Sequence, residues 1–538
     1  MQIDQSEPFS KRAGFWLAWM AITVVYFAIR INLLDIPLDR DEGTFGLIGR
    51  TILEGGVPYI DAIDHKPPLL FFIYAAALLI FPPTAFGIHL FLHLYNFLTL
   101  ITLFFIGRRL FGAAGALWTS LAFALFSANQ NIQGFTGSSE MFMLLPLSLS
   151  LLFALRGSQH GLQLAQLAMS GIFGALACWT KPTVVTSVLF VVVLIAVMLI
   201  RNREFPEKRS RIAKGWSAWL AGGIGISLLI AGYFVANGAF GELIYWVFEH
   251  GAIYSSEAEL ATSLGIVSDS LWVILLSSPV VTGAAMLLAL YFSRQNGFNA
   301  CVAWGFFLFS LAGTLLGFTY AHYFAQLAPA IALISGFGLS ELTNRLSGAH
   351  TMRIAAPIIA LLMIAGEVGP NSGYYVSSSP KEISRQHFGP NPFYESEEFA
   401  AYLRAHSQAD DKVLIFGSEP QILLLAERAS ATSYVVIYPL LWEAFPRYRE
   451  FQEKMMREIG NEPPAFIIMT NLPFSLRWDE RASLEPLHMV NRMIGGDYAL
   501  QYEMQLSMRQ RRWITITENN PPPQETGENY FIRVFKRR

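Results

Sequence analysis

A series of long apolar runs constrains this chain more than any other feature of its sequence. A helix needs about 20 predominantly apolar residues to cross the hydrocarbon core of a bilayer. Hydrophobic residues make up 53% of the chain and charged residues only 14%, whereas a soluble domain carries about 25% charged residues. The expected spans are residues 15–34, 86–107, 112–128, 139–155, 164–180, 183–200, 215–236, 269–292, 299–318, 323–342 and 354–367. The sequence therefore predicts an α-helical polytopic membrane protein with about 11 transmembrane helices.

A shorter apolar run, residues 69–81, decides the topology of everything after it. Short loops rich in Lys and Arg prefer the cytoplasmic side of a membrane. If this run does not cross, the basic segment 201–214 shares a side with the N-terminus, and acidic residues predominate on the other side. We therefore expect 69–81 to lie in the outer interface as an interfacial helix, and the N-terminus to be cytoplasmic.

From about residue 369 the composition becomes that of a soluble domain. Strand-like and helix-like segments alternate there, which is typical of a small α/β domain. The expected strands are Lys412–Phe416, Ser433–Ile437 and Ala465–Met469, and the expected helices are Glu419–Glu427 and Tyr448–Ile459. We expect residues 1–368 to form the transmembrane domain, with a first outer loop at 35–85, and residues 369–538 to form a soluble domain on the outer face.

Charge and spacing argue against several classes of function. The net charge is −2 and the basic residues are dispersed, which argues against nucleic acid as a partner. Cys178 and Cys301 both lie inside apolar runs, which argues against a disulfide or a cysteine metal site. His89 and His93 share one helical face, but no Glu follows the first His as in a zinc-protease helix.

The first outer loop carries three carboxylates within four positions, Asp39, Asp41 and Glu42. Carboxylates near a membrane surface can deprotonate an acceptor hydroxyl, orient it, or bind a divalent cation. Acidic outer loops are common, so charge alone favours the simpler interpretation that these are solvated loop residues.

Basic residues are scarce in the expected outer loops, which singles out Lys66 and Lys181. Each could hold a lipid phosphate at headgroup depth, or could be a snorkelling lysine that anchors a helix. Glu140 precedes a span, where the helix dipole would stabilise its carboxylate. His322 opens another span at the same level, and a lone histidine there is more often structural.

Six motifs in chain order resemble the polytopic GT-C glycosyltransferases of the dolichyl-phosphate-mannose protein mannosyltransferase type, which include the aminoarabinose transferase of lipid A. The motifs are Asp41-Glu42-Gly43, Asp64-His65-Lys66-Pro67-Pro68-Leu69, Gly107-Arg108-Arg109-Leu110-Phe111-Gly112, Ser139-Glu140, Thr180-Lys181-Pro182 and His322-Tyr323-Phe324-Ala325-Gln326-Leu327-Ala328-Pro329. They cover about the first 330 residues, and the match extends loosely into the C-terminal domain.

The resemblance implies transfer of a sugar from a polyprenyl-phosphate carrier to an acceptor hydroxyl of an envelope lipid, glycan or protein, usually with inversion at the anomeric carbon. It implies Asp41 as the catalytic base and Glu42 beside it, although Asp39 keeps the identity of the base open. Lys66 and Lys181 would neutralise the leaving lipid phosphate. The remaining substrate-binding candidates are Asp39, His65, Glu140, His322, Tyr323 and Gln326.

The resemblance does not settle metal dependence, so a divalent cation remains an open expectation and no other cofactor is implied. It suggests a bacterial inner membrane. Two other classes of function remain. An envelope-lipid transporter would show paired repeats and ionisable residues near mid-membrane, and an anchored binding or assembly protein would not need so many spans.

One further outer segment, residues 237–268, is rich in aromatic side chains, including Tyr245, Trp246 and His250. Aromatic rings pack well on the C–H faces of a sugar, so this segment could close over a bound substrate. An interfacial helix with an aromatic belt would have the same composition.

Overall fold

The computed structural model describes residues 9–159, 162–201, 208–256, 260–294, 297–316, 320–346, 349–476, 482–522 and 529–538. Its contacts divide the chain into two compact units. The helical unit comprises residues up to Leu34, His89–Gly232 and Ser255–Ser378. The loop–sheet unit comprises Asp35–Ile88, Tyr233–Tyr254 and Ser379–Arg538. The domain boundary at residue 368/369, predicted from the sequence, remains a proposal. The first loop, within Asp35–Ile88, belongs to the same unit as the C-terminal residues.

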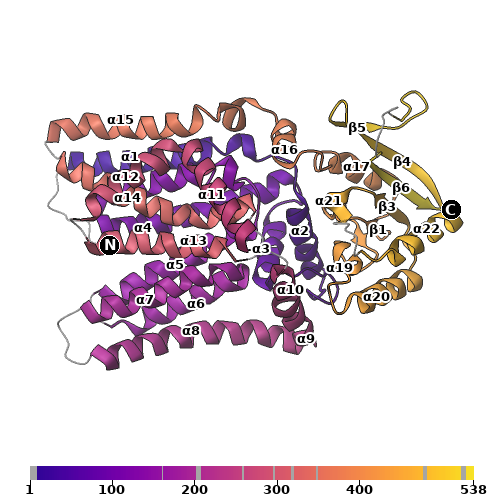
Figure 1. Cartoon of the computed structure of the whole chain (residues 1–538), viewed down its shortest axis with the longest axis horizontal. Helices are drawn as coiled ribbons and strands as arrows, with labels where there is room; N and C mark the ends of the chain where they lie inside the picture. Colours follow the sequence, from indigo (N-terminus) through magenta and orange to yellow (C-terminus); the bar gives the residue numbers. More distant parts are fainter. Residues whose placement is uncertain are drawn as a thin grey trace. The chain divides into compact units, whose positions relative to one another are not determined.

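The helical unit is a bundle of long apolar helices (Figure 1). Its helices are α1 (Phe9–Ala28), α4 (Ala85–Phe126), α5 (Ser139–Gln159), α6 (Leu164–Thr180), α7 (Val185–Arg201), α8 (Lys208–Ala236), α11 (Leu260–Ser277), α12 (Ala285–Ser293), α13 (Gly297–Thr314), α14 (Ala328–Arg345) and α15 (Ala349–Val368). Among the residues that the structure describes, seven helices are long and apolar enough to cross a membrane, or up to eight if one bent pair of helices counts as a single span. The membrane fold class is confirmed, whereas the number of 11 spans is not.

Helix α4 contains a reversal of the chain at Gly112, whose φ of 78° and ψ of −164° are not helical. In a straight helix, Gly107 and Thr119 would be about 18 Å apart. A Cβ atom on Gly107 would instead lie 2.6 Å from Oγ1 of Thr119 and 2.8 Å from the carbonyl oxygen of Gly115. The two arms therefore pack against each other, as the separate runs 86–107 and 112–128 predict.

Small residues let neighbouring helices of this unit approach closely. Between α5 and α6, the hydroxyl of Ser150 donates to the carbonyl of Ser170, and the hydroxyl of Ser170 donates to the carbonyl of Ser150, both at 2.8 Å. Between α6 and α8, a Cβ atom on Gly171 would lie 1.8 Å from the carbonyl oxygen of Trp219. Such contacts are typical of helix pairs in membranes, where backbone approach replaces the hydrophobic driving force.

The run 269–292, expected as a single span, is bent by 103° between Thr262–Ser277 and Pro279–Ser293. Pro279 begins the second arm, and proline cannot supply the amide that would continue the helix. The buried Glu367 of α15 accepts hydrogen bonds from Ser278 and, at 2.8 Å, from the amide of Asn129. Pro279 therefore explains the bend locally, and the bond from Ser278 to Glu367 ties the bend to helix α15.

The loop–sheet unit begins with α2 (Arg40–Leu53) and α3 (Pro68–Ile80). Helix α3 matches the short run expected at 69–81, and its 13 residues span about 20 Å. A Cβ atom on Gly49 of α2 would lie 2.7 Å from the amide nitrogen of Ala75 of α3, so the two helices are in backbone contact. Phe45 and Tyr74 add an edge-to-face contact with ring centroids 5.6 Å apart.

A six-stranded sheet forms the C-terminal part of this unit, in the order β2-β1-β3-β6-β4-β5 (Figure 1). The strands are β1 (Lys412–Phe416), β2 (Ala429–Ser430), β3 (Phe466–Thr470), β4 (Tyr498–Ser507), β5 (Arg512–Thr515) and β6 (Phe531–Arg537). The accompanying helices include α9 (Phe240–Ile244), α10 (Gly251–Ser256), α16 (Pro380–Phe388), α17 (Ser396–His406), α18 (Gln421–Ala426), α19 (Tyr438–Leu441), α20 (Tyr448–Asn461), α21 (Pro473–Leu476) and α22 (Glu485–Asp497). Strands β1, β2 and β3 are parallel, whereas β6, β4 and β5 are added antiparallel.

The expected strand at Ser433–Ile437 is wrong. Its backbone amides bond to side chains instead of a neighbouring strand: the Ser433 amide donates to Glu458 at 3.0 Å, and the Ile437 amide donates to Ser418 at 3.3 Å. The segment is buried, which explains its apolar, strand-like composition. The pairing with β1 falls earlier, at Ala429–Ser430.

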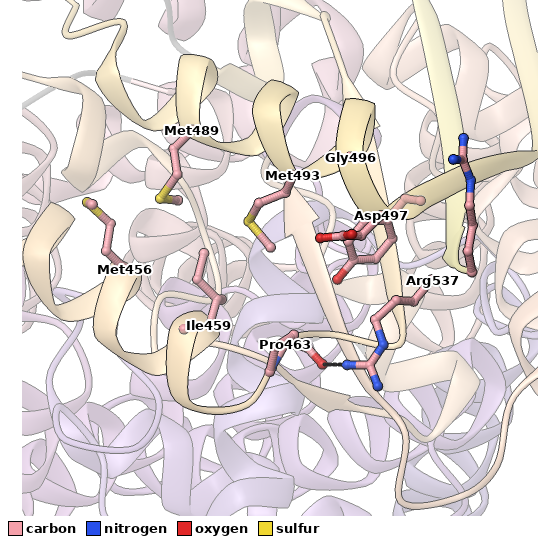
Figure 2. A pocket seen from close by; sticks show the side chains of 11 residues that line it. Met456, Ile459, Pro463, Met489, Met493, Gly496, Asp497 and Arg537 are labelled. Atoms are coloured by element: carbon pink, nitrogen blue, oxygen red, sulfur yellow. Dashed lines mark hydrogen bonds between the residues drawn. The ribbon is translucent and has the colours of Figure 1, made fainter.

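A cavity of about 610 Å³ lies between α20 and α22 of this unit. Met456 and Ile459 of α20 project toward Met489 and Met493 of α22 (Figure 2). Asp497 and Arg537 lie toward one end, where Arg537 donates a hydrogen bond to the carbonyl of Pro463 at 3.2 Å. None of the residues singled out in the sequence lines this cavity.

Candidate functional site

The acidic motif forms the N-terminus of helix α2. Asp39 is the N-cap, and its carboxylate accepts a hydrogen bond from the amide of Glu42 at 2.8 Å. The carboxylate of Glu42 in turn accepts from the amide of Asp39 at 3.2 Å, which completes a capping box. Such a pair satisfies two amides that the first helical turn leaves without a partner. The sequence signal for this local fold is an acidic N-cap followed three residues later by Glu.

The three carboxylates of the motif consequently differ in environment. Glu42 is buried, with 1% of its surface exposed, whereas Asp41 is exposed. Burial, together with the neighbouring charges of Glu42 and Asp41, raises the pKa of Asp39 well above its usual range. Within the described residues, Asp41 is the carboxylate of this motif that no capping hydrogen bond occupies. Asp41 is thus the carboxylate of this motif that is most accessible to solvent.

A second group of polar residues in the same unit closes the first loop. The carboxylate of Asp64 lies 3.2 Å from Nδ1 of His65 and accepts from the amide of Lys66 at 3.3 Å. Burial would raise the pKa of Asp64, but His65 and Lys66 outweigh it and lower the pKa to about 2. The hydroxyl of Tyr59 donates to the carbonyl of Lys66 at 2.8 Å, which fixes the backbone here. Asp64 is therefore ionised and orients both residues of the motif.

His65 also contacts the C-terminal residues of the loop–sheet unit. The hydroxyl of Tyr438 lies 2.8 Å from Nδ1 of His65, and the charge of Asp41 acts on the same imidazole. Asp39, Asp41, Glu42, His65 and Lys66 thus all belong to the loop–sheet unit. Sequence reasoning missed Tyr438, because no motif marks a tyrosine that is separated from His65 by 373 positions.

The aromatic segment between α8 and α10 packs on the same unit. His250 is fully buried and stacks on Phe445, with ring centroids 4.0 Å apart. Trp246 stacks on Phe451 at 4.9 Å, and its indole donates to Glu242 at 3.2 Å. These rings are therefore core side chains of the loop–sheet unit, and their faces are already covered by other aromatic residues.

The other five candidates belong to the helical unit, where Glu140 and Lys181 form a buried ion pair of 2.7 Å. The side chains are 2% and 5% exposed, and Lys181 also lies 4.0 Å from the centre of the Tyr323 ring. Nε2 of His322 lies 3.9 Å from the Glu140 carboxylate. Three separate segments of the chain therefore meet at one charged cluster.

Gln326 supports the cluster from within. Its side-chain amide donates to the carbonyl of Ser310 at 2.9 Å and accepts from the hydroxyl of Thr183 at 3.4 Å. With 1% of its surface exposed, Gln326 holds the segment Ala321–Leu327 against α13. This geometry indicates a structural role for Gln326, whereas the exposed fraction of 20% at the side chain of His322 leaves that ring accessible.

His89 and His93, which share one helical face, are both buried in the helical unit. His89 is buried and its Nδ1 lies 3.1 Å from the carbonyl oxygen of Leu34, while His93 is 2% exposed. Among the residues that the structure describes, no group of three or more His, Cys, Asp or Glu is arranged to hold a metal ion. The divalent cation therefore remains an untested expectation.

Residues 65–231 match the family model of the dolichyl-phosphate-mannose-protein mannosyltransferases. No curated protein sequence matches the chain. ArnT from Cupriavidus metallidurans, solved bound to undecaprenyl phosphate, is similar with a TM-score of 0.59 and 14% identity, over 95% of this chain and 99% of ArnT. The oligosaccharyltransferase from Archaeoglobus fulgidus in its apo form gives a TM-score of 0.49 and 13% identity, over 96% of this chain and 76% of that protein.

At 14% identity the likeness to ArnT shows the fold, and the matching family model covers part of the same chain. Together they confirm the resemblance expected from the motifs. The chain is an integral membrane protein with the fold of the GT-C type membrane glycosyltransferases.

Proposed function

We propose that the chain transfers a sugar from a polyprenyl-phosphate carrier to a hydroxyl group of an envelope lipid, glycan or protein. The observation that carries this proposal is the exposed Asp41 carboxylate at the N-terminus of α2, set apart from two carboxylates that cap the helix. The GT-C fold supports it, and so does the undecaprenyl phosphate bound to the similar ArnT. The donor is then a hexosyl or pentosyl phospholipid.

In the proposed reaction, the acceptor oxygen attacks the anomeric carbon while Asp41 accepts the hydroxyl proton. The new carbon–oxygen bond replaces the bond to the phosphate, which leaves as polyprenyl phosphate with an additional negative charge. This single displacement inverts the anomeric configuration. Positioned cations that meet the developing charge lower the barrier.

Lys66 and Lys181 are the two candidates for that cation. Lys181 already pairs with Glu140, so a phosphate would have to share its ammonium group. Lys66 is half-buried, and its backbone is fixed by Tyr59 and Asp64. We propose both Lys66 and Lys181 as ligands of the leaving phosphate, with His65 and His322 as further substrate contacts.

The proposal is tested by reconstituting the purified protein with radiolabelled polyprenyl-phosphate sugars and candidate acceptors. We expect wild type to transfer label, Asp41→Asn to lose transfer, and Lys66→Ala to raise the KM for the donor. Asp35→Asn is the matched control, because Asp35 is an exposed carboxylate of the same unit outside the acidic motif. Full activity of Asp41→Asn would remove Asp41 as the base, and transport of label without transfer would identify a flippase.

We further propose that the chain lies in a bacterial inner membrane, with the N-terminus cytoplasmic and the acidic loop and C-terminal domain outside. The basic segment 201–214 supports this orientation. A reporter enzyme fused after residue 210 is expected to report a cytoplasmic location. An outward signal from that fusion would show that the short helix α3 crosses the membrane.

A further inference from the structure

The three parallel strands of the loop–sheet unit share one carboxyl edge, and β1 ends there at Phe416. In open α/β sheets this edge is the usual place for a ligand, because the loops that follow the strands form a crevice. Here the residues after β1 are Gly417, Ser418 and Glu419, and Arg40 of helix α2 bonds to Ser418 and Glu419. A side chain from the acidic motif is therefore held at the carboxyl edge of the sheet.

Arg40 makes several contacts at this edge. Its Nη2 atom lies 2.8 Å from Oε1 of Glu419 and 3.3 Å from the side-chain oxygen of Asn391. Its Nε atom donates to the carbonyl of Ser418. The guanidinium thus uses two sides of its planar fork, a geometry that a lysine cannot reproduce.

Glu419 is held equally firmly on the sheet side. Its second oxygen accepts from the amide of Ser418 at 2.9 Å and from the hydroxyl of Ser475, which follows β3, at 2.5 Å. The side chain of Glu419 is only 2% exposed, compared with 22% for Arg40. The carboxylate is therefore fixed by the loops after two strands before it meets the arginine.

The helix itself lies directly on the same edge. A Cβ atom on Gly43 would be 2.4 Å from the amide nitrogen of Gln421, at the start of α18. One turn later, a Cβ atom on Gly46 would be 2.4 Å from a methyl group of Leu424. Two glycines at this spacing give α2 a flat face that lets the backbone of its first turn rest against α18.

We infer that the Arg40–Glu419 ion pair is a positioning device, through which the C-terminal sheet fixes the direction of the Asp41 carboxylate. Arg40 and Asp41 are adjacent in the first turn of α2, so an anchored Arg40 sets the rotation of that turn about the helix axis. The inference rests on the proposed function, because it gives the C-terminal domain a role in the same transfer reaction. Arg40 and Glu419 are positioning residues and do not touch the substrate.

The test compares variants that break the pair with a matched ion pair elsewhere in the sheet. Glu419→Gln keeps the shape of the side chain and removes its charge. Glu503→Gln is the control, since Glu503 pairs with Arg533 at 3.0 Å between β4 and β6, away from α2. Hydrogen exchange of the peptide covering 36–50 and steady-state transfer kinetics are measured for both variants.

We expect Glu419→Gln to speed exchange in the first turn of α2 and to lower kcat about 10- to 100-fold, because a misplacement of about 1 Å costs catalysis on this scale. The KM for the donor is expected to stay within about threefold, because a positioning loss acts on the chemical step. Glu503→Gln is expected to change neither property. A kcat within twofold of wild type for Glu419→Gln would overturn the inference, whether or not exchange becomes faster.

A second pair of variants covers the case in which Glu419→Gln does not fold. Arg40→Gln leaves the two sheet-side hydrogen bonds of Glu419 in place, and Arg40→Lys restores the charge with a single contact. We expect Arg40→Lys to recover part of the kcat that Arg40→Gln loses, and equal activity of the two variants would contradict the proposed role.

The variant Asp41→Asn separates the positioning role from the proposed transferase function. If Asp41→Asn loses transfer while Glu419→Gln keeps the wild-type kcat, the transferase function is supported and the positioning role is wrong. If the wild-type protein shows no transfer with any donor, hydrogen exchange still tests the positioning role. Exchange in the first turn of α2 that is the same in Arg40→Gln and wild type would then overturn the inference.

Discussion

Asp39 and Glu42 cap helix α2 reciprocally, with hydrogen bonds of 2.8 and 3.2 Å between each carboxylate and the other residue's amide. Each carboxylate therefore has one face directed at the helix backbone. Asp41, which lies between them in sequence, is exposed and belongs to the same first turn. Within four residues, the reciprocal cap thus sets two structural carboxylates apart from Asp41, the one that we propose as the base.

The first prediction follows from this separation. Asp41→Asn should lower kcat by about 10²- to 10⁴-fold, the usual contribution of a general base. Asp39→Asn should keep most activity, because asparagine is also a good N-cap, whereas Asp39→Ala should cost about 1 kcal/mol of stability. Transfer rates and thermal unfolding in detergent measure the two effects. A larger loss of kcat in Asp39→Asn than in Asp41→Asn would assign the base to Asp39 instead.

The second prediction concerns the buried pair of Glu140 and Lys181. Lys181→Met leaves the carboxylate of Glu140 buried without its 2.7 Å partner, which should cost about 3–5 kcal/mol. The double variant Glu140→Gln/Lys181→Met removes both charges and should be distinctly more stable than Lys181→Met. Thermal unfolding of the two single variants and the double variant forms the cycle that isolates their coupling. Additive losses of stability would show that the pair contributes no coupling energy.

The sequence predicts the parts of this fold that depend on local pattern. Long apolar runs predict helices, and the short strand-like runs that become β1 and β3 are recognisable because they are continuous and buried. Strand β4 was missed, because its exposed and buried residues do not alternate cleanly along the chain. The segment 433–437 was misassigned, because its amides bond to Glu458 and Ser418, which no local pattern reveals.

In the candidate site, too, sequence patterns do not reveal contacts between distant residues. The motifs single out charged residues as site candidates, which stays a prediction, and in the structure Glu140 and Lys181 form an ion pair although they are 41 positions apart. The local spacing of Asp39 and Glu42 signals their helix cap, but no motif predicts that Glu42 is buried or that Arg40 reaches Glu419. Those relationships depend on packing between distant segments, so they emerge only when the chain is folded.

The third prediction is a pH dependence of stability that originates at His250. Burial lowers the pKa of His250 to about 3, with the neighbouring His65 adding to the effect and Asp64 opposing it. Between pH 3 and 6.5 the unfolded chain therefore binds more protons at this residue, so the free energy of unfolding rises with pH. From pH 7 to pH 5 the folded state should lose about 2 kcal/mol through this group.

The variant His250→Phe tests this origin. Phenylalanine retains the stacking on Phe445, whose ring centroid lies 4.0 Å away, and cannot take up a proton. Thermal unfolding at pH 7 and pH 5 should show a smaller drop in Tm for His250→Phe than for wild type. His406→Phe, the same substitution at an exposed histidine, is the comparison. An identical drop in wild type and His250→Phe would place the pH dependence at other groups.

The last prediction uses the two glycines that lay α2 against α18. In Gly43→Ala the new Cβ atom would lie 2.4 Å from the backbone nitrogen of Gln421, so one of the two backbones must move. In Gly46→Ala the nearest atom is at the same distance, but it is the end of the flexible Leu424 side chain, which can rotate away. We therefore expect Gly43→Ala to cost about 1–3 kcal/mol, the usual range for overpacking, and to lower transfer because the first turn of α2 shifts with Asp41. Gly46→Ala should cost less stability and retain activity.

Gly241→Ala is the control for the substitution itself, since no atom lies within 4 Å of its new Cβ. Unfolding temperatures and transfer rates that are equal for Gly43→Ala and Gly241→Ala would show that α2 is not seated on α18 closely enough to hold Asp41 in place.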